Sequence, residues 1–185
     1  MGRPSNREQK RAEILKAFAR VLADHGYAGA TIAAIALEAG IAPGLVHHHF
    51  HDKAELLRSL LQDLISKFRQ RVRHYQASDD PLLAYVDAAL KLDERADAVA
   101  AKCWVGVFAE AVREPVLFGQ MRTLIDTEIT SIEQRSRGRL SSAEAGSVLA
   151  FIIGALVLGA FAPRKTAGFA APGLRKLIAS FAVGS

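Results

Sequence analysis

The sequence contains one cysteine, six prolines and few aromatic residues. A single cysteine, Cys103, excludes an internal disulfide and a cysteine-rich zinc site, and it agrees with a reducing cytoplasm. No stretch alternates apolar and polar residues for long enough to predict a sheet. The N-terminal residues are polar and lack the apolar segment of a secretory signal. We therefore expect a cytoplasmic, all-helical protein.

Positive charge is concentrated in the first part of the chain. Residues 1–74 contain 12 Lys/Arg and 7 Asp/Glu, whereas residues 75–185 contain 12 of each, so the net charge of +5 arises entirely before residue 75. This asymmetry predicts a polyanionic partner for the N-terminal part. Ordinary surface charge is the alternative explanation.

Apolar residues at helical spacing, together with capping residues, predict about nine helices. Asp52, Asp80 and Ser141 are expected to cap the helices that follow them. Pro163 and Gly168 are expected to form a loop before the last helix. The expected helices cover residues 7–25, 31–39, 43–50, 52–75, 81–92, 95–113, 115–137, 141–162 and 171–183.

Two short helices separated by a glycine turn follow the first long helix, which is the layout of a helix-turn-helix. Gly40 permits the positive φ of a tight turn, and Thr31 is expected to cap the first short helix. The second short helix would enter the major groove of DNA with its N-terminal half. Its residues expected to face or flank DNA are Pro43, Gly44, Leu45, His47, His48 and His49.

The stretch from Thr31 to Leu57 resembles the DNA-binding signature of the TetR (tetracycline-repressor) family. The matching positions are Thr31, Ile35, Ala36, Ala39, Gly40, Gly44, His49, Phe50, Lys53, Leu56 and Leu57. The resemblance implies a helix-turn-helix domain over residues 1–54 and a helical ligand-binding and dimerisation domain over residues 55–185. It implies a homodimeric transcriptional regulator of double-stranded DNA, a repressor released by an unidentified small molecule, and not an enzyme.

Two departures from the signature change which residues we expect to recognise DNA. Ala42 stands where the family has a capping Ser, which weakens the cap by about 1 kcal/mol. His47 replaces the usual Tyr. We expect His47 and His48 to read base edges, Leu45 to contact a thymine methyl, and Lys53 to contact phosphate.

The N-terminal arm carries further positive charge. Arg3 and Arg7 are expected to reach an adjacent minor groove, where arginine is attracted to narrow A·T-rich DNA; a solvated tail is the alternative. The complete expected DNA-binding set is Arg3, Arg7, Thr31, Pro43, Gly44, Leu45, His47, His48, His49 and Lys53.

The chain from about residue 81 onward loosely resembles the choline-regulator (BetI-like) branch of the family. The resemblance rests on Trp104, Phe108, Ala109, Glu110, Ala111 and Glu114-Pro115, and it identifies no ligand. A mostly apolar pocket is expected, with plain core packing as the alternative for each residue. The candidate lining residues are Phe68, Tyr85, Cys103, Trp104, Val107, Phe108, Phe118 and Met121. No catalytic arrangement, cofactor or metal is expected.

Residues 148–162 contain no charge. As a helix they rise about 22 Å, less than the roughly 30 Å of a bilayer core, so we expect burial against a second copy rather than in a membrane. The expected dimer residues are Leu149, Ile153, Leu156, Leu177 and Phe181. A purely intramolecular core and a membrane-associated helical interaction protein are the alternatives.

The histidine run permits one more interpretation. His47 and His51 are spaced i, i+4, which places both on one helix face and suits zinc binding. No further ligand cluster accompanies them in the sequence. A His-cluster metal-binding protein therefore remains a secondary hypothesis.

Overall fold

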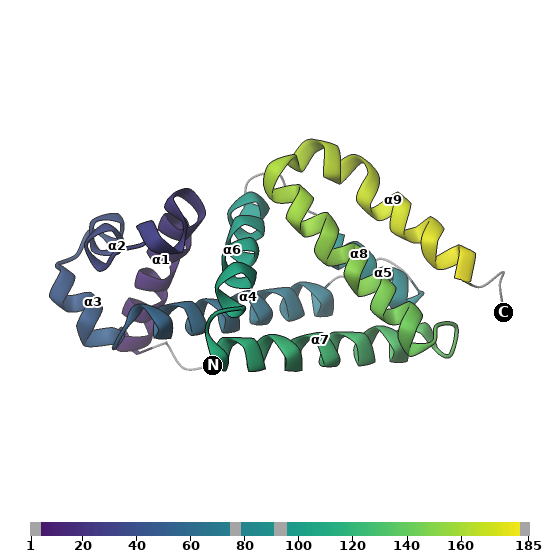
Figure 1. Cartoon of the computed structure of the whole chain (residues 1–185), viewed down its shortest axis with the longest axis horizontal. Coiled ribbons are helices and arrows are strands. Elements are labelled where there is room, and N and C mark those ends of the chain that lie inside the picture. Colours follow the sequence, from purple (N-terminus) through teal and green to yellow (C-terminus); the bar gives the residue numbers. More distant parts are fainter. Residues whose placement is uncertain (1–4, 75–78, 91–95, 182–185) are drawn as a thin grey trace.

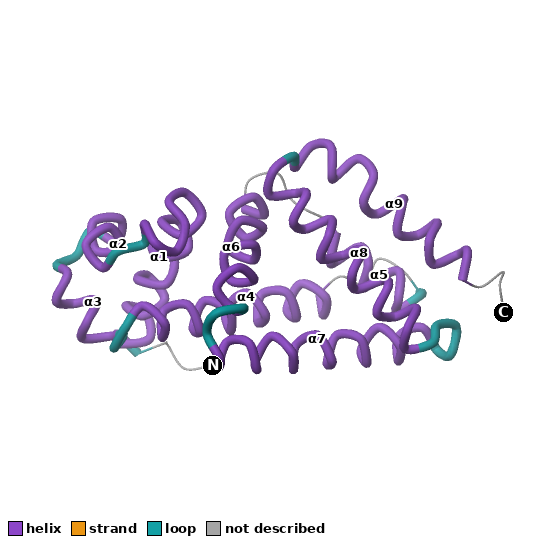
Figure 2. The backbone as a smooth tube through the Cα atoms, viewed as in Figure 1, coloured by secondary structure: helices purple, strands orange, loops and turns teal. Residues whose placement is uncertain are grey.

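The computed structural model describes residues 5–74, 79–90 and 96–181, which contain nine helices and no strand (Figure 2). The expected all-helical class is confirmed. The helices are α1 (Asn6–Gly29), α2 (Ile32–Ala39), α3 (Pro43–His49), α4 (Lys53–His74), α5 (Pro81–Leu90), α6 (Ala96–Ala111), α7 (Pro115–Ser136), α8 (Ser142–Phe161) and α9 (Pro163–Phe181).

The short helices α2 and α3 lie at one end of an elongated molecule, and α8 and α9 lie toward the other (Figure 1). Helix α4 leaves the α1–α3 group and runs into the middle of the molecule. Helix α6 packs against α1 as well as against α7 and α8. Two routes, α4 and α6, therefore connect the helix-turn-helix to the C-terminal helices.

A first hydrophobic cluster holds the N-terminal helices together. Ile14, Phe18 and Ile35 are almost completely buried in it, and Leu60 of α4 joins them. Val107 of α6 belongs to the same cluster. The core thus continues across the expected domain boundary at residues 54/55, so motions of α6 and of α1 are mechanically linked.

A second cluster joins the C-terminal helices. Leu82 and Val86 of α5, Ile152 of α8 and Leu174 of α9 are buried there. Helix α8 packs on α6, α7 and α9. This cluster forms the framework around the cavity described below.

The expected capping residues lie where the sequence placed them. The Asp80 carboxylate accepts hydrogen bonds from the backbone N–H of Leu82 at 2.9 Å, and Ser141 and Glu144 form a capping box at the start of α8. Asp52 accepts from the N–H of Glu55 at 2.6 Å. Side-chain acceptors satisfy N–H groups that lack partners within the helix.

The prediction of a loop at Pro163–Gly168 is wrong, because α9 begins at Pro163. Proline suits the first position of a helix, where no N–H is needed, and the N–H of Thr166 already bonds to the carbonyl of Ala162 at 3.0 Å. The first helix breaks at Gly26, which has φ 70°, directly after its expected end at residue 25. Helical backbone then resumes and continues to Gly29, so α1 extends beyond the expected range.

Candidate nucleic-acid interface and ligand cavity

Helices α2 and α3 have the geometry of a helix-turn-helix. The Thr31 hydroxyl accepts from the N–H of Ala34 at 3.1 Å and caps α2. Gly40 ends α2 in the left-handed region with φ 64°, as the turn requires. Ala42 makes no side-chain cap to α3, and Pro43 occupies the first turn. The N-terminus of α3 therefore lacks the side-chain cap, as Ala42 predicted.

Helix α3 has one inward face and one exposed face. Val46 and His49 are buried, whereas Pro43, His47 and His48 are exposed. Burial lowers the pKa of His49, which favours the neutral imidazole. Of the histidines expected to face DNA, two therefore share the open side of α3, and His49 packs beneath them.

Arg11 of α1 contacts the residues at the end of α3. Its guanidinium donates to the backbone carbonyl of His49, lies 4.0 Å from the centre of the Phe50 ring and pairs with Glu55 at 3.0 Å. Glu55 also accepts from the N–H of His51 at 2.7 Å. That hydrogen bond, together with Arg11, lowers the pKa of Glu55, so the carboxylate is charged at neutral pH. Its ion pair with Arg11 connects α1 to the first turn of α4.

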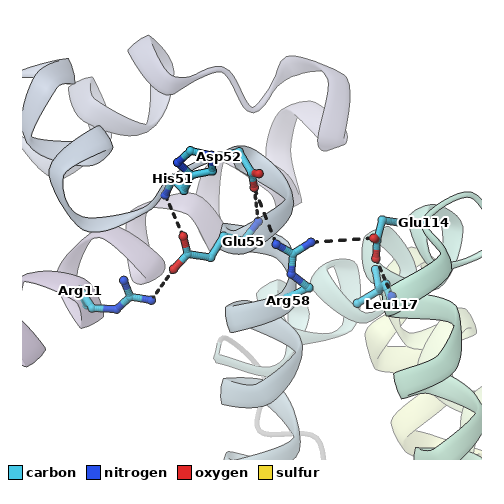
Figure 3. A network of polar contacts seen from close by, with 7 residues as sticks. All are labelled: Arg11, His51, Asp52, Glu55, Arg58, Glu114 and Leu117. Carbon is cyan, nitrogen blue, oxygen red and sulfur yellow. Dashed lines mark hydrogen bonds and ion pairs between the residues drawn. The ribbon is translucent and has the colours of Figure 1, made fainter.

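Arg58 extends this network toward the C-terminal helices (Figure 3). Its guanidinium lies 3.9 Å from Asp52 and 3.8 Å from Glu114. Glu114 caps α7 by accepting from the N–H of Leu117. A chain of polar contacts therefore runs from α1 through the start of α4 to the start of α7, a connection that sequence spacing did not suggest.

The positively charged residues of the expected DNA-binding set differ in exposure and in the intramolecular contacts that they make. Arg7 is exposed in the first turn of α1, and Arg3 lies outside the described residues. The Lys53 ammonium donates to the Tyr27 carbonyl at 2.7 Å and lies 4.1 Å from the centre of the Tyr27 ring. An ammonium has three N–H donors, so Lys53 can bond to Tyr27 and still donate to a phosphate. The phosphate contact stays a prediction, and the contact with Tyr27 is a second, intramolecular role.

An apolar cavity of about 70 Å³ lies among α4, α5, α6, α7 and α8. The rings of Trp104 and Phe108 stack on its wall with centroids 5.7 Å apart. Five of the expected pocket residues line it: Phe68, Tyr85, Trp104, Phe108 and Met121.

The other three expected pocket residues lie elsewhere. The Cys103 thiol donates to the carbonyl of Ala19 in α1 at 3.2 Å, and burial raises its pKa to about 12. Val107 belongs to the first hydrophobic cluster, and Phe118 is exposed on α7. Cys103 and Val107 thus join α6 to the helix-turn-helix instead of lining the cavity.

Sequence reasoning missed a buried polar pair at the cavity wall. Tyr85 donates to Glu128 Oε2 at 2.8 Å, and burial beside that carboxylate raises the pKa of Tyr85. Glu128 follows Met121, Leu124 and Ile125 on one face of α7, all lining the cavity. The i, i+3, i+4, i+7 spacing from Met121 is the signal that identifies this face.

The residues expected to form a dimer are partly or fully covered within the chain, and their role in a dimer stays a prediction. Leu149, Ile153 and Leu156 line the cavity, whereas Leu177 and Phe181 pack against the second cluster. The surface of α8 carries other apolar side chains, including Leu158, 52% exposed, and Phe161, 79% exposed.

Among the described helices α8 alone is long and apolar enough to cross a membrane, with 33% of its apolar window buried. Helices in the cores of soluble proteins pass the same test. Within the described ranges, no three His, Cys, Asp or Glu side chains gather into a group that would hold a metal ion. Neither observation adds a second kind of site.

The family model for bacterial regulatory proteins of the tetR family matches residues 14–60, which span α1 to α4 through the helix-turn-helix. Over 160 residues the chain is 28% identical to the HTH-type transcriptional regulator BetI of Escherichia coli, covering 82% of each protein. Residues 14–60 are a DNA-binding domain of the tetR family. The chain is a DNA-binding transcriptional regulator with similarity to BetI.

Other relatives agree with this assignment. BetI of Stenotrophomonas maltophilia is 31% identical over 113 residues, which span 58% of this chain and 57% of that protein. A transcriptional regulator of Rhodococcus sp. RHA1 has the same fold, with TM-score 0.84, 24% identity and coverage of 94% and 96% of the two chains.

A regulator of Saccharomonospora viridis in complex with choline superposes with TM-score 0.80 at 22% identity, covering 92% of this chain and 96% of that one. At this identity the likeness concerns the fold. The names of the relatives are those of transcriptional regulators, and none is that of an enzyme.

Proposed function

We propose that this TetR-family regulator is a cytoplasmic homodimeric repressor that binds a specific DNA sequence and releases it when a small molecule binds. Residues 1–54 would bind DNA, and residues 55–185 would bind the effector and the second copy. The observation that carries the proposal is the open face of α3, on which His47 and His48 are exposed at the end of the molecule remote from α9 (Figure 1).

The charge distribution supports DNA contact at this end. All of the net positive charge lies before residue 75, and clustered positive charge supplies the sequence-independent part of DNA affinity. A dimer would place two copies of α3 in successive major grooves about one helical turn apart. The exposed apolar face of α8 supports such pairing, because apolar surface of this kind is stabilised by a partner.

The cavity supports regulation by a small molecule. Its wall includes side chains of α4, the helix whose first turns belong to the Arg11–Glu55–Arg58 network. A ligand that binds one position of α4 better than another would shift the spacing of the two α3 helices. Choline, bound by the Saccharomonospora viridis relative, is one candidate for a first screen.

The test is a DNA-binding titration of the His47→Ala/His48→Ala double variant at fixed salt. We expect affinity for the cognate site to fall by roughly 30-fold or more, because the variant removes two base contacts and each good contact contributes about 1–3 kcal/mol. Non-specific affinity is expected to change little. His74→Ala, at the far end of α4, is the matched control. Equal affinity of the double variant and the control would exclude α3 as the reading helix.

A further inference from the structure

A groove of about 520 Å³ runs between α4 and α7 on the outside of the molecule. It shares two lining residues, Ile65 and Leu124, with the apolar cavity. These two side chains therefore form the wall between the groove and the cavity.

The groove and the cavity differ in chemistry. The cavity wall is mostly aliphatic and aromatic, with Arg71 and Glu128 as its charged lining residues, whereas the groove is edged by side chains that form hydrogen bonds. The polar residues among its described lining are Gln62, Arg69, Gln120, Thr123 and Thr127. One hollow suits an apolar group and the adjacent hollow suits a polar group, which is the pattern of a site for an amphiphile.

Arg69 determines the charge that the groove prefers, since it is the only charged residue among the described lining. It forms an ion pair with Glu128, in which its Nε lies 4.0 Å from Oε1, a distance too long for a hydrogen bond. The side chain is 49% exposed, so its planar set of N–H donors can meet a carboxylate.

Gln120 adds a second requirement. Its side-chain carbonyl oxygen is enclosed and has no hydrogen-bond partner in the described part of the chain. An enclosed acceptor without a donor is unfavourable. The hydroxyls of Thr123 and Thr127 donate to backbone carbonyls of α7 at 3.1 and 2.7 Å, so neither supplies that donor. A donor on the ligand would supply it once the Gln120 amide turns toward the groove that this residue lines.

We propose that the groove and the cavity are one two-part effector site for an amphiphilic carboxylic acid with a hydroxyl or amide N–H near its carboxylate. The apolar end occupies the cavity, the carboxylate pairs with Arg69, and the neighbouring donor meets Gln120. The apolar end enters past Ile65 and Leu124 and widens the cavity, since about 70 Å³ is less than an alkyl tail fills. This proposal rests on the effector role of the cavity and names the class of ligand that the site takes.

Trp104 is the only tryptophan of the chain and lines the cavity, so its fluorescence reports occupancy directly. The probes are 3-hydroxyoctanoate, octanoate, octanol and octyltrimethylammonium, titrated into the full-length protein. We expect saturable binding that is tightest for 3-hydroxyoctanoate. Octanoate, which leaves Gln120 unpaired, is expected to bind roughly tenfold more weakly.

Arg69→Met tests the charge. We expect this variant to bind 3-hydroxyoctanoate roughly tenfold more weakly or worse and octanol within about twofold of the original protein. Arg122→Met is the matched control, because Arg122 is exposed on α7 and lines neither hollow. Leu124→Ala is expected to raise the association rate in stopped-flow fluorescence, since it shortens one of the two side chains that separate the groove from the cavity.

The outcomes separate the two proposals. Tighter binding of octyltrimethylammonium or octanol than of either carboxylate, or an Arg69→Met variant that behaves like Arg122→Met, overturns the two-part site while the cavity keeps its effector role. No saturable fluorescence change with any of the four probes overturns the two-part site, whereas the effector role of the cavity is tested separately with other ligands, choline among them. DNA binding by α3 is measured without a ligand and is unaffected by either result.

Discussion

The helix-turn-helix end and the C-terminal helices of this regulator differ in how completely they bury their apolar side chains. Among residues 5–74, Leu37 is the one large hydrophobic side chain that is exposed. The described C-terminal residues expose eight: Val99, Val112, Val116, Phe118, Ile125, Leu158, Phe161 and Phe169. The first region buries nearly all of its large apolar side chains, partly against α6, whereas the second leaves apolar side chains at its surface.

The charges follow the opposite pattern. The N-terminal region carries the whole net positive charge, and the C-terminal region is neutral overall. The proposed polar recognition of DNA and the proposed apolar recognition of a ligand or a second copy would therefore be separated along the chain, although the two regions share one hydrophobic cluster through α6. The following changes test how far that separation holds.

The largest effect is expected from the Leu158→Glu/Phe161→Glu variant. Charges on this exposed α8 surface would be buried without partners in a dimer, so we expect a monomer in size-exclusion chromatography with light scattering. Loss of the second α3 would lower DNA affinity about 100-fold or more, since each half-site contributes several kcal/mol. Phe118→Glu on α7 is the control and is expected to leave the dimer intact. A dimeric double variant would place the interface elsewhere.

Val107→Ala tests the shared core. Val107 is fully buried in the first cluster, and removing two methyl groups is expected to cost about 2 kcal/mol in free energy of unfolding. Hydrogen exchange is expected to speed up in α1 as well as in α6. Val86→Ala, equally buried in the second cluster, is expected to cost a similar amount and leave α1 protected. Unchanged α1 protection in Val107→Ala would mean that the two regions are independent.

Lys53→Ala distinguishes a DNA contact from an internal one. If Lys53 contacts phosphate, affinity falls at every sequence and the slope of log affinity against log salt becomes shallower by about 1. We expect that result, together with a loss of about 1 kcal/mol of stability from the broken hydrogen bond to Tyr27. Lys67→Ala, further along α4, is the control. A stability loss with an unchanged salt slope would show that Lys53 is purely structural.

Glu55→Gln is expected to have the smallest effect. The pKa of Glu55 is lowered from 4.5 in the folded protein by the N–H of His51 and by Arg11. Its stabilising contribution is therefore complete above about pH 4.5 and is lost as the pH falls through the lower folded value. Because the side chain is 32% exposed, we expect less than about 1 kcal/mol at pH 7. Denaturant titrations from pH 3 to 7 check this, and a difference between variant and original protein that persists at pH 3 would contradict it.

The helix-turn-helix was predictable from the sequence because its requirements are local. Gly40 must adopt a positive φ, Thr31 must cap α2, and the apolar spacing of Ile35 and Ala36 is short-range. The start of α9 was not predictable, because a proline after a helix is compatible with a loop and with a first helical turn alike.

The cavity was predictable only in part. Trp104 and Phe108 stood out as aromatic residues one helical turn apart, but whether Cys103 faces the cavity or α1 depends on how α6 is rotated against its neighbours. The contacts of Lys53 with Tyr27 and of Arg58 with Glu114 join residues distant in sequence. Such pairs follow from tertiary packing, which local patterns do not encode.

The most direct test of the DNA-binding account is selection of bound sequences from random double-stranded DNA by the full-length protein at fixed salt. We expect enrichment of a two-fold symmetric motif whose half-sites lie about one helical turn apart, with the His47→Ala/His48→Ala variant failing to enrich it. No enriched motif, with binding no tighter than to non-specific DNA, would contradict the account.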